Sequence, residues 1–144
     1  MARGAISTNI KSIYKVGTID IQKFVSSFTG GNGYNINDGI EYIELPAIPG
    51  IDEKVHNIIT VKGDSMSPLI EDGDMLIVNT SKIKPKKGDI VAVVLNDNLM
   101  VKLFDPGAVC LHLTSINQDY EPIRVYEEDT CIIVGIVWKV IKDV

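Results

Sequence analysis

The chain has 144 residues, 45% of them hydrophobic and 23% charged, and its 19 acidic and 14 basic side chains give a net charge of −5. This composition excludes a disordered chain and predicts one compact domain with an ordinary apolar core. Because an acidic domain repels a phosphate backbone, it also argues against DNA binding by this chain alone.

The first 47 residues differ from the rest, and we interpret residues 1–47 as an arm or linker before a domain at residues 48–144. Three glycines cluster in the segment Thr-Gly-Gly-Asn-Gly at residues 29–33, and a proline-rich stretch closes the arm. A helix-turn-helix needs three helical segments and a basic recognition face, and residues 1–47 have neither. No DNA-binding domain is therefore expected in this chain.

Periodicity within the arm leaves its local structure open. The apolar residues Ile21, Phe24, Val25 and Phe28 have helical spacing, whereas residues 10–16 alternate as they would in a strand. Both interpretations are kept.

From residue 58 onward, short β-branched runs alternate with Gly, Asp and Pro, which predicts a mostly-β domain. The runs are residues 58–61, 75–78, 90–94, 99–104, 109–114 and 131–141. Between two of them, Asn96-Asp97-Asn98 predicts a hairpin, because Asn and Asp accept positive φ better than most residues. This hairpin would place Lys102 on the return strand.

A run of four lysines, the strongest local positive charge, lies at residues 82–87 around Pro85 and leads into Gly88-Asp89. We interpret it as a solvated turn and not as a nucleic-acid contact.

Cys110 and Cys131 lie in apolar runs, and the N-terminus carries no signal sequence, so we expect reduced, buried thiols in a cytoplasmic protein. His112 would share a strand face with Cys110, but no second pair with ligand spacing accompanies them, so neither a metal nor another cofactor is expected. The longest apolar run, residues 131–138, is far shorter than the roughly 20 residues of a membrane span.

Lys102 is the lysine best suited to act as a base. Strand alternation places it on one face with Met100 and Phe104, and the residues between them are also apolar, so both faces are apolar. Burial disfavours the ammonium form and would leave a usable amine near neutral pH. The alternative is that Lys102 extends its ammonium into water, as most strand lysines do.

Ser65 follows Gly63-Asp64 in what would otherwise be an ordinary turn, and Lys102 follows it by 37 residues. Together with their surroundings, these residues resemble the LexA-like serine peptidases, a family that includes phage repressors and UmuD. The resemblance implies a β-rich fold of twisted, partly barrel-like antiparallel sheets, with the cleavage segment on an N-terminal arm. It is carried in order by residues 61–68, 70–78, 87–91, 101–102, 113–117 and 133–137.

The resemblance implies roles for individual residues. Ser65 would be the nucleophile, Lys102 the general base, and the backbone amides of Asp64 and Ser65 the oxyanion hole. Family members cut their own chain between a small residue and a glycine upstream of the serine.

The corresponding bond here is Gly30-Gly31, where Gly30 precedes Ser65 by 35 residues. No Ala-Gly or Cys-Gly dipeptide, the usual cleavage sequence, occurs in the chain. Cleavage displaced to Thr29-Gly30, loss of cleavage, and a plain flexible linker remain alternatives.

The resemblance implies an autocatalytic serine endopeptidase domain of an SOS-type or prophage transcriptional repressor. Such a domain forms a homodimer, and its cleavage, induced by a RecA filament on single-stranded DNA, relieves repression after DNA damage. A UmuD-like polymerase accessory protein is one alternative. Another is a non-cleaving dimerisation module controlled by an antirepressor. A signal peptidase uses similar Ser and Lys chemistry, but no membrane anchor is evident in these residues.

Overall fold

The computed structural model describes residues 18–24, 27–28, 34–35 and 40–142. Every regular element in these residues is a strand, which confirms the mostly-β prediction. This part of the chain has no helix of the length and apolarity that a membrane crossing requires. The strands are β1 Thr18–Phe24, β2 Ser27–Phe28, β3 Tyr34–Asn35, β4 Ile40–Pro46, β5 His56–Thr60, β6 Met75–Asn79, β7 Ile90–Leu95, β8 Asn98–Pro106, β9 Leu111–Thr114, β10 Ile123–Arg124 and β11 Cys131–Ile141.

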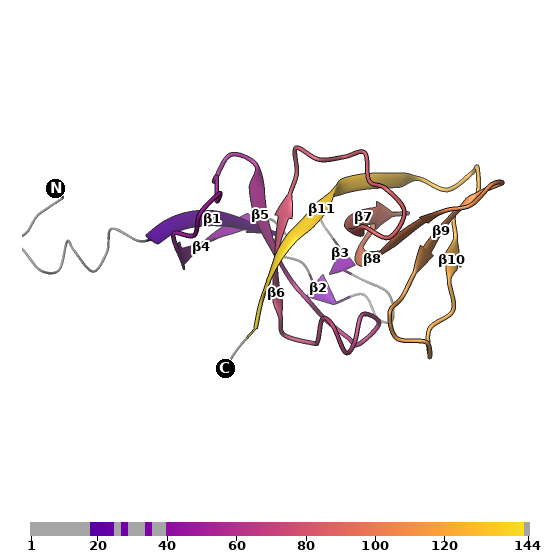
Figure 1. Ribbon diagram of the computed structural model, residues 1–144, viewed down its shortest axis with the longest axis horizontal. Helices are drawn as coiled ribbons and strands as arrows, with labels where there is room; N and C mark the ends of the chain where they lie inside the picture. The colour runs from indigo at the N-terminus through magenta and orange to yellow at the C-terminus, as the bar shows by residue number, and fades with distance from the viewer. Residues whose placement is uncertain (1–17, 25–26, 29–33, 36–39, 143–144) are drawn as a thin grey trace, which may run out of the picture.

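The strands form one 11-stranded sheet ordered β10-β9-β8-β7-β11-β6-β5-β1-β4, and β3 attaches the short β2 to β8. Among the described strands, β1 and β5 form the one parallel pair, and the others are antiparallel. The long β11 pairs with β7 through its first half and with β6 through its second (Figure 1). It therefore lies between two groups of strands in the sheet: β7, β8, β9 and β10 on one side, and β6, β5, β1 and β4 on the other.

The arm contributes strands to this sheet. β1 pairs with β4 along its whole length and with β5 at two positions, and Ile21 is fully buried. Of the two interpretations left open for this segment, the strand is observed at residues 18–24, because pairing on both sides satisfies the backbone there. Residues 10–16 lie outside the described residues, and the division at residue 47 stays a prediction.

The predicted hairpin is confirmed. Asn96 and Asp97 have φ values of 49° and 71° and connect β7 to β8, with Leu95 paired to Asn98. Positive φ at both central residues is what a two-residue hairpin turn requires. Lys102 accordingly lies on the return strand, paired with Val91 of β7.

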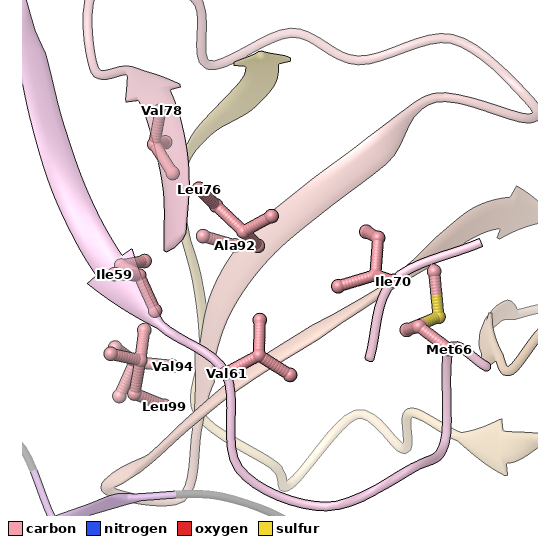
Figure 2. Close-up of a cluster of buried hydrophobic side chains, with 9 residues drawn as sticks. All are labelled: Ile59, Val61, Met66, Ile70, Leu76, Val78, Ala92, Val94 and Leu99. Atoms are coloured by element: carbon pink, nitrogen blue, oxygen red, sulfur yellow. The ribbon is translucent and has the colours of Figure 1, made fainter. Parts of the chain in front are cut away.

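One cluster of the hydrophobic core has nine buried side chains (Figure 2). Six come from β5, β6, β7 and the start of β8, and three come from the connection between β5 and β6. Of these three, Met66 directly follows the candidate nucleophile Ser65, and Ile70 lies five residues after it. The members are Ile59, Val61, Met66, Ile70, Leu76, Val78, Ala92, Val94 and Leu99.

Candidate active site

The candidate nucleophile Ser65 lies in the connection between β5 and β6, residues 61–74, which we call the serine loop. Its side chain is half-buried, and the next residue, Met66, is 2% exposed. Ile70 is fully buried, and its N–H donates to the Met66 carbonyl at 3.0 Å. The core therefore anchors the loop just after Ser65, which limits how far this residue moves.

Asp74 closes the serine loop at its far end. Its carbonyl accepts from the Val61 N–H at 2.8 Å, and its carboxylate accepts from the Glu71 N–H at 2.8 Å and from Lys142 Nζ at 2.5 Å. The Glu71 amide, followed by Lys142, lowers the pKa of Asp74. The end of β11 is thus tied to the loop that carries Ser65.

Lys102 is only 2% exposed, so the alternative in which its ammonium extends into water is wrong. Its Nζ donates to Ser115 Oγ at 2.9 Å and lies 5.4 Å from the centre of the Tyr120 ring. Within the described residues, no carboxylate forms an ion pair with it. Burial lowers the pKa of Lys102, because desolvation penalises the ammonium form.

Replacing Lys102 by methionine, in a Ser65→Ala background that prevents cleavage, is expected to raise the free energy of unfolding by about 1 kcal/mol at neutral pH. The unfolded chain binds more protons than the folded chain between the lowered pKa and roughly 10.4, the ordinary lysine value. Stability of the lysine chain should therefore rise with pH across that window, and that of the methionine variant should rise less. Urea unfolding at several pH values measures the difference. Parallel pH dependences would contradict a lowered lysine pKa.

Residues 115–120, which follow β9, contact both the serine loop and Lys102, and we call them the bridging segment. Its Asn117 donates from Nδ2 to the Asp64 carbonyl at 3.0 Å and from its backbone N–H to the Ser65 carbonyl at 2.9 Å. Tyr120 donates its hydroxyl to the Asp64 carboxylate at 2.5 Å. Since the bridging segment also contains Ser115, one short stretch holds the surroundings of both candidate catalytic residues.

The structure describes Ser65, Lys102 and Asp64 among the predicted site residues, but not the predicted cleavage site. Ser65 and Lys102 share the bridging segment, but within the described residues no hydrogen bond joins them directly. The backbone amides of Asp64 and Ser65 donate to no acceptor in the described part of the chain. Gly30 and Gly31 lie outside the described residues.

Sequence reasoning assigned no role to Ser115, Asn117 or Tyr120. The first two lie in a stretch that carried part of the family resemblance, and Tyr120 lies just beyond it. The available signal was a cluster of polar side chains directly after a strand, at the point where a chain leaves a sheet.

A surface cavity and the two cysteine thiols lie apart from this site. A surface cavity of about 470 Å³ at the lysine run is lined by neither Ser65 nor Lys102, but by Ser81, Lys82, Ile83, Lys84, Lys86, Asp89 and Ile136.

The thiols Cys110 and Cys131 are free and half-buried, so they are less buried than expected. Burial, with a smaller contribution from Asp129, raises the pKa of the Cys131 thiol. Cys110 Sγ lies 3.9 Å from His112 Nδ1, and no third side chain completes a metal-binding group among the described residues.

Comparison with known proteins identifies the family. A family model described as Peptidase S24-like matches residues 23–138. A LexA repressor of Desulfatibacillum aliphaticivorans is 38% identical over 72 residues, which are 49% of this chain and 35% of that protein. LexA repressors of Shewanella denitrificans and Shewanella baltica are 35% identical over 69 residues, 47% of this chain and 33% of theirs.

The chain thus matches about a third of the length of these curated relatives. The family model, in contrast, covers most of the chain, and its match includes the serine loop, Lys102 and the bridging segment. The resemblance to LexA-like peptidases is therefore confirmed at the level of the family: the chain belongs to the Peptidase S24-like family.

Proposed function

We propose that this chain is the self-cleaving serine-lysine peptidase domain of a cytoplasmic LexA-type repressor. The observation that carries the proposal is the buried Lys102, which has no carboxylate partner among the described residues and contacts the same bridging segment as the serine loop. A lysine with a lowered pKa supplies a neutral amine, and a serine needs such a base to become a nucleophile. The bridging segment, six residues long, contacts both Lys102 and the serine loop.

In the proposed reaction, neutral Lys102 accepts the Ser65 hydroxyl proton as Oγ attacks the carbonyl carbon of the scissile bond. The carbonyl electron pair moves to oxygen, and the Asp64 and Ser65 amides stabilise the resulting oxyanion. The tetrahedral intermediate then collapses, the C–N bond breaks, and the leaving amine takes the proton from the Lys102 ammonium. Water, activated by the same lysine, hydrolyses the acyl-serine and releases the second fragment.

The proposed scissile bond is Gly30-Gly31, which precedes the short strand β3. β3 is antiparallel to β8, with Tyr34 opposite Leu99. The Gly30-Gly31 bond lies on the N-terminal side of β3 in the sequence, and its choice rests on the 35 residues between Gly30 and Ser65.

As a repressor domain, the chain would act as a homodimer, and cleavage stimulated by a RecA filament on single-stranded DNA would relieve repression. DNA contact would belong to a domain not evident in these residues. The net charge of −5 supports DNA contact through another domain, because a negatively charged surface disfavours contact with phosphates.

A second candidate function is a non-cleaving dimerisation module of a repressor, controlled by an antirepressor protein. The observation that favours it is the Gly30-Gly31 sequence, since the chain contains no Ala-Gly or Cys-Gly bond. On this interpretation, Ser65 and Lys102 would be retained without a substrate segment.

Intact mass measured against time tests the two candidates. At mildly alkaline pH, the parent chain is expected to yield two fragments that together exceed its mass by one water, with the cut near Gly30-Gly31. The Ser65→Ala variant should stay whole under the same conditions. A parent chain that stayed whole at every pH, and also with an activated RecA filament, would favour the non-cleaving module.

A further inference from the structure

Asn117 holds the peptide group between Asp64 and Ser65 from one side. Its Nδ2 donates to the Asp64 carbonyl oxygen at 3.0 Å, and the Ser67 N–H reaches the same oxygen at 3.1 Å. The Asn117 backbone N–H donates to the Ser65 carbonyl oxygen at 2.9 Å. Two consecutive carbonyl groups next to the candidate nucleophile are thus fixed in orientation.

This arrangement also sets the direction of the Ser65 N–H. A trans peptide is planar, and its C=O and N–H bonds point in opposite directions. The cis bond recorded among the described residues is Ser67-Pro68, so the Asp64-Ser65 peptide is trans. Because the Asp64 oxygen points toward Asn117, the Ser65 N–H points away from Asn117, and it meets no acceptor in the described part of the chain.

Tyr120 fixes the same residue a second time. Its hydroxyl donates to the Asp64 carboxylate, and this hydrogen bond raises the pKa of the Tyr120 hydroxyl. The Tyr120 ring also contacts the Lys102 ammonium. Although Asp64 is exposed, both its carbonyl and its carboxylate are therefore held by the bridging segment.

We propose that Asn117 is a positioning residue that aims the Ser65 N–H at the oxyanion; this inference rests on the proposed role of Ser65 as the nucleophile. Negative charge develops on the scissile carbonyl oxygen as Oγ adds to the carbon. A donor that already points at this oxygen stabilises it without reorganisation. Without Asn117 Nδ2, the Asp64 carbonyl oxygen loses one of its two hydrogen bonds and keeps the one from the Ser67 N–H, so the Asp64-Ser65 peptide is held less firmly in this orientation.

The test compares self-cleavage rates across pH for the parent, Asn117→Ala and Ser115→Ala. Loss of one oxyanion donor slows catalysis by about 10²- to 10³-fold, and Asn117→Ala is expected to lower the plateau rate by about 10²-fold. The midpoint of its pH profile should not move, because the Lys102 contacts with Ser115 and Tyr120 are untouched. Ser115→Ala instead removes an acceptor of the ammonium and should shift the midpoint to lower pH. A general loss of structure would not lower the plateau rate in one variant and shift the midpoint of the pH profile in the other.

A second readout is covalent labelling of Ser65 by a fluorophosphonate, followed by intact mass. In this reaction Oγ forms a bond to phosphorus, fluoride leaves, and Lys102 takes the hydroxyl proton. The Asn117→Ala variant should label more slowly than the parent by a similar factor. If thermal melting shows that this variant is unfolded, Asn117→Ser replaces it, since serine makes a smaller change and is also too short to reach the Asp64 carbonyl.

The outcomes separate the inference from the proposed function. A parent that labels without cleaving would end the self-cleavage proposal, while the labelling rates would still test Asn117. A folded Asn117 variant with the parent's rate in either reaction would overturn the positioning role. A parent that neither cleaves nor labels would overturn both proposals.

Discussion

Replacing Lys102 by alanine is expected to lower the rate of self-cleavage by at least about 10³-fold, because general-base activation of a serine contributes about 10²- to 10⁴-fold. The parent rate should rise with pH and level off once the amine is neutral. Since burial lowers the pKa of Lys102, the midpoint of this rise should lie below that of an exposed lysine. The first-order decay of the intact mass, followed at a series of pH values, measures both quantities.

Two comparisons sharpen this result. Lys87→Ala is a matched control, because the Lys87 side chain is 78% exposed and its ion pair with Asp105 is long, at 4.0 Å; it should cleave at the parent's rate. The double variant of Ser65→Ala and Lys102→Ala should be no slower than either single variant, since the two residues act as a unit. A Lys102→Ala chain that cleaved at the parent's rate would rule out Lys102 as the base.

The second large effect is expected at Gly135, in the middle of β11, where replacement by alanine should destabilise the fold by about 3 kcal/mol. A Cβ at this position would lie against the Asn79 carbonyl oxygen and 2.8 Å from Val78 Cγ1. Both neighbours belong to β6, and β11 passes from β7 to β6 at this point, so the backbone has little room to move away. Urea unfolding in the Ser65→Ala background measures the loss.

Gly88→Ala is the matched control for that experiment. Gly88 has a positive φ of 90°, but a Cβ there would meet no atom within 4 Å. It should therefore cost only the strain of a left-handed residue, about 1 kcal/mol. If Gly135→Ala proved as mild as Gly88→Ala, the close approach of β11 to β6 would not be needed for stability.

Local pattern was sufficient for most of the strands after residue 55, but it left the burial of Lys102 open. The β-branched runs predicted the strands of residues 56–141 except the two-residue β10, because alternation and turn residues are properties of neighbouring positions. Apolar residues on both faces of β8 were compatible with a buried Lys102, but most strand lysines extend into water, and only the structure, with an exposed fraction of 2%, decided for burial. The secondary structure of the arm was ambiguous in the sequence, because β1 is stabilised by pairing with β4 and β5. The periodicity of one segment does not reveal which strands it pairs with.

The sequence by itself thus determined the β-rich class, the hairpin that returns the chain to Lys102, and the two candidate catalytic residues. Only the tertiary structure decided that Ser115, Asn117 and Tyr120 contact the surroundings of both. Asn117 lies 53 residues from Asp64, and Lys142 lies 68 residues from Asp74, its partner at the end of the serine loop. Contacts over such separations depend on the register of several strands and on the paths of the loops between them, and no local pattern encodes these.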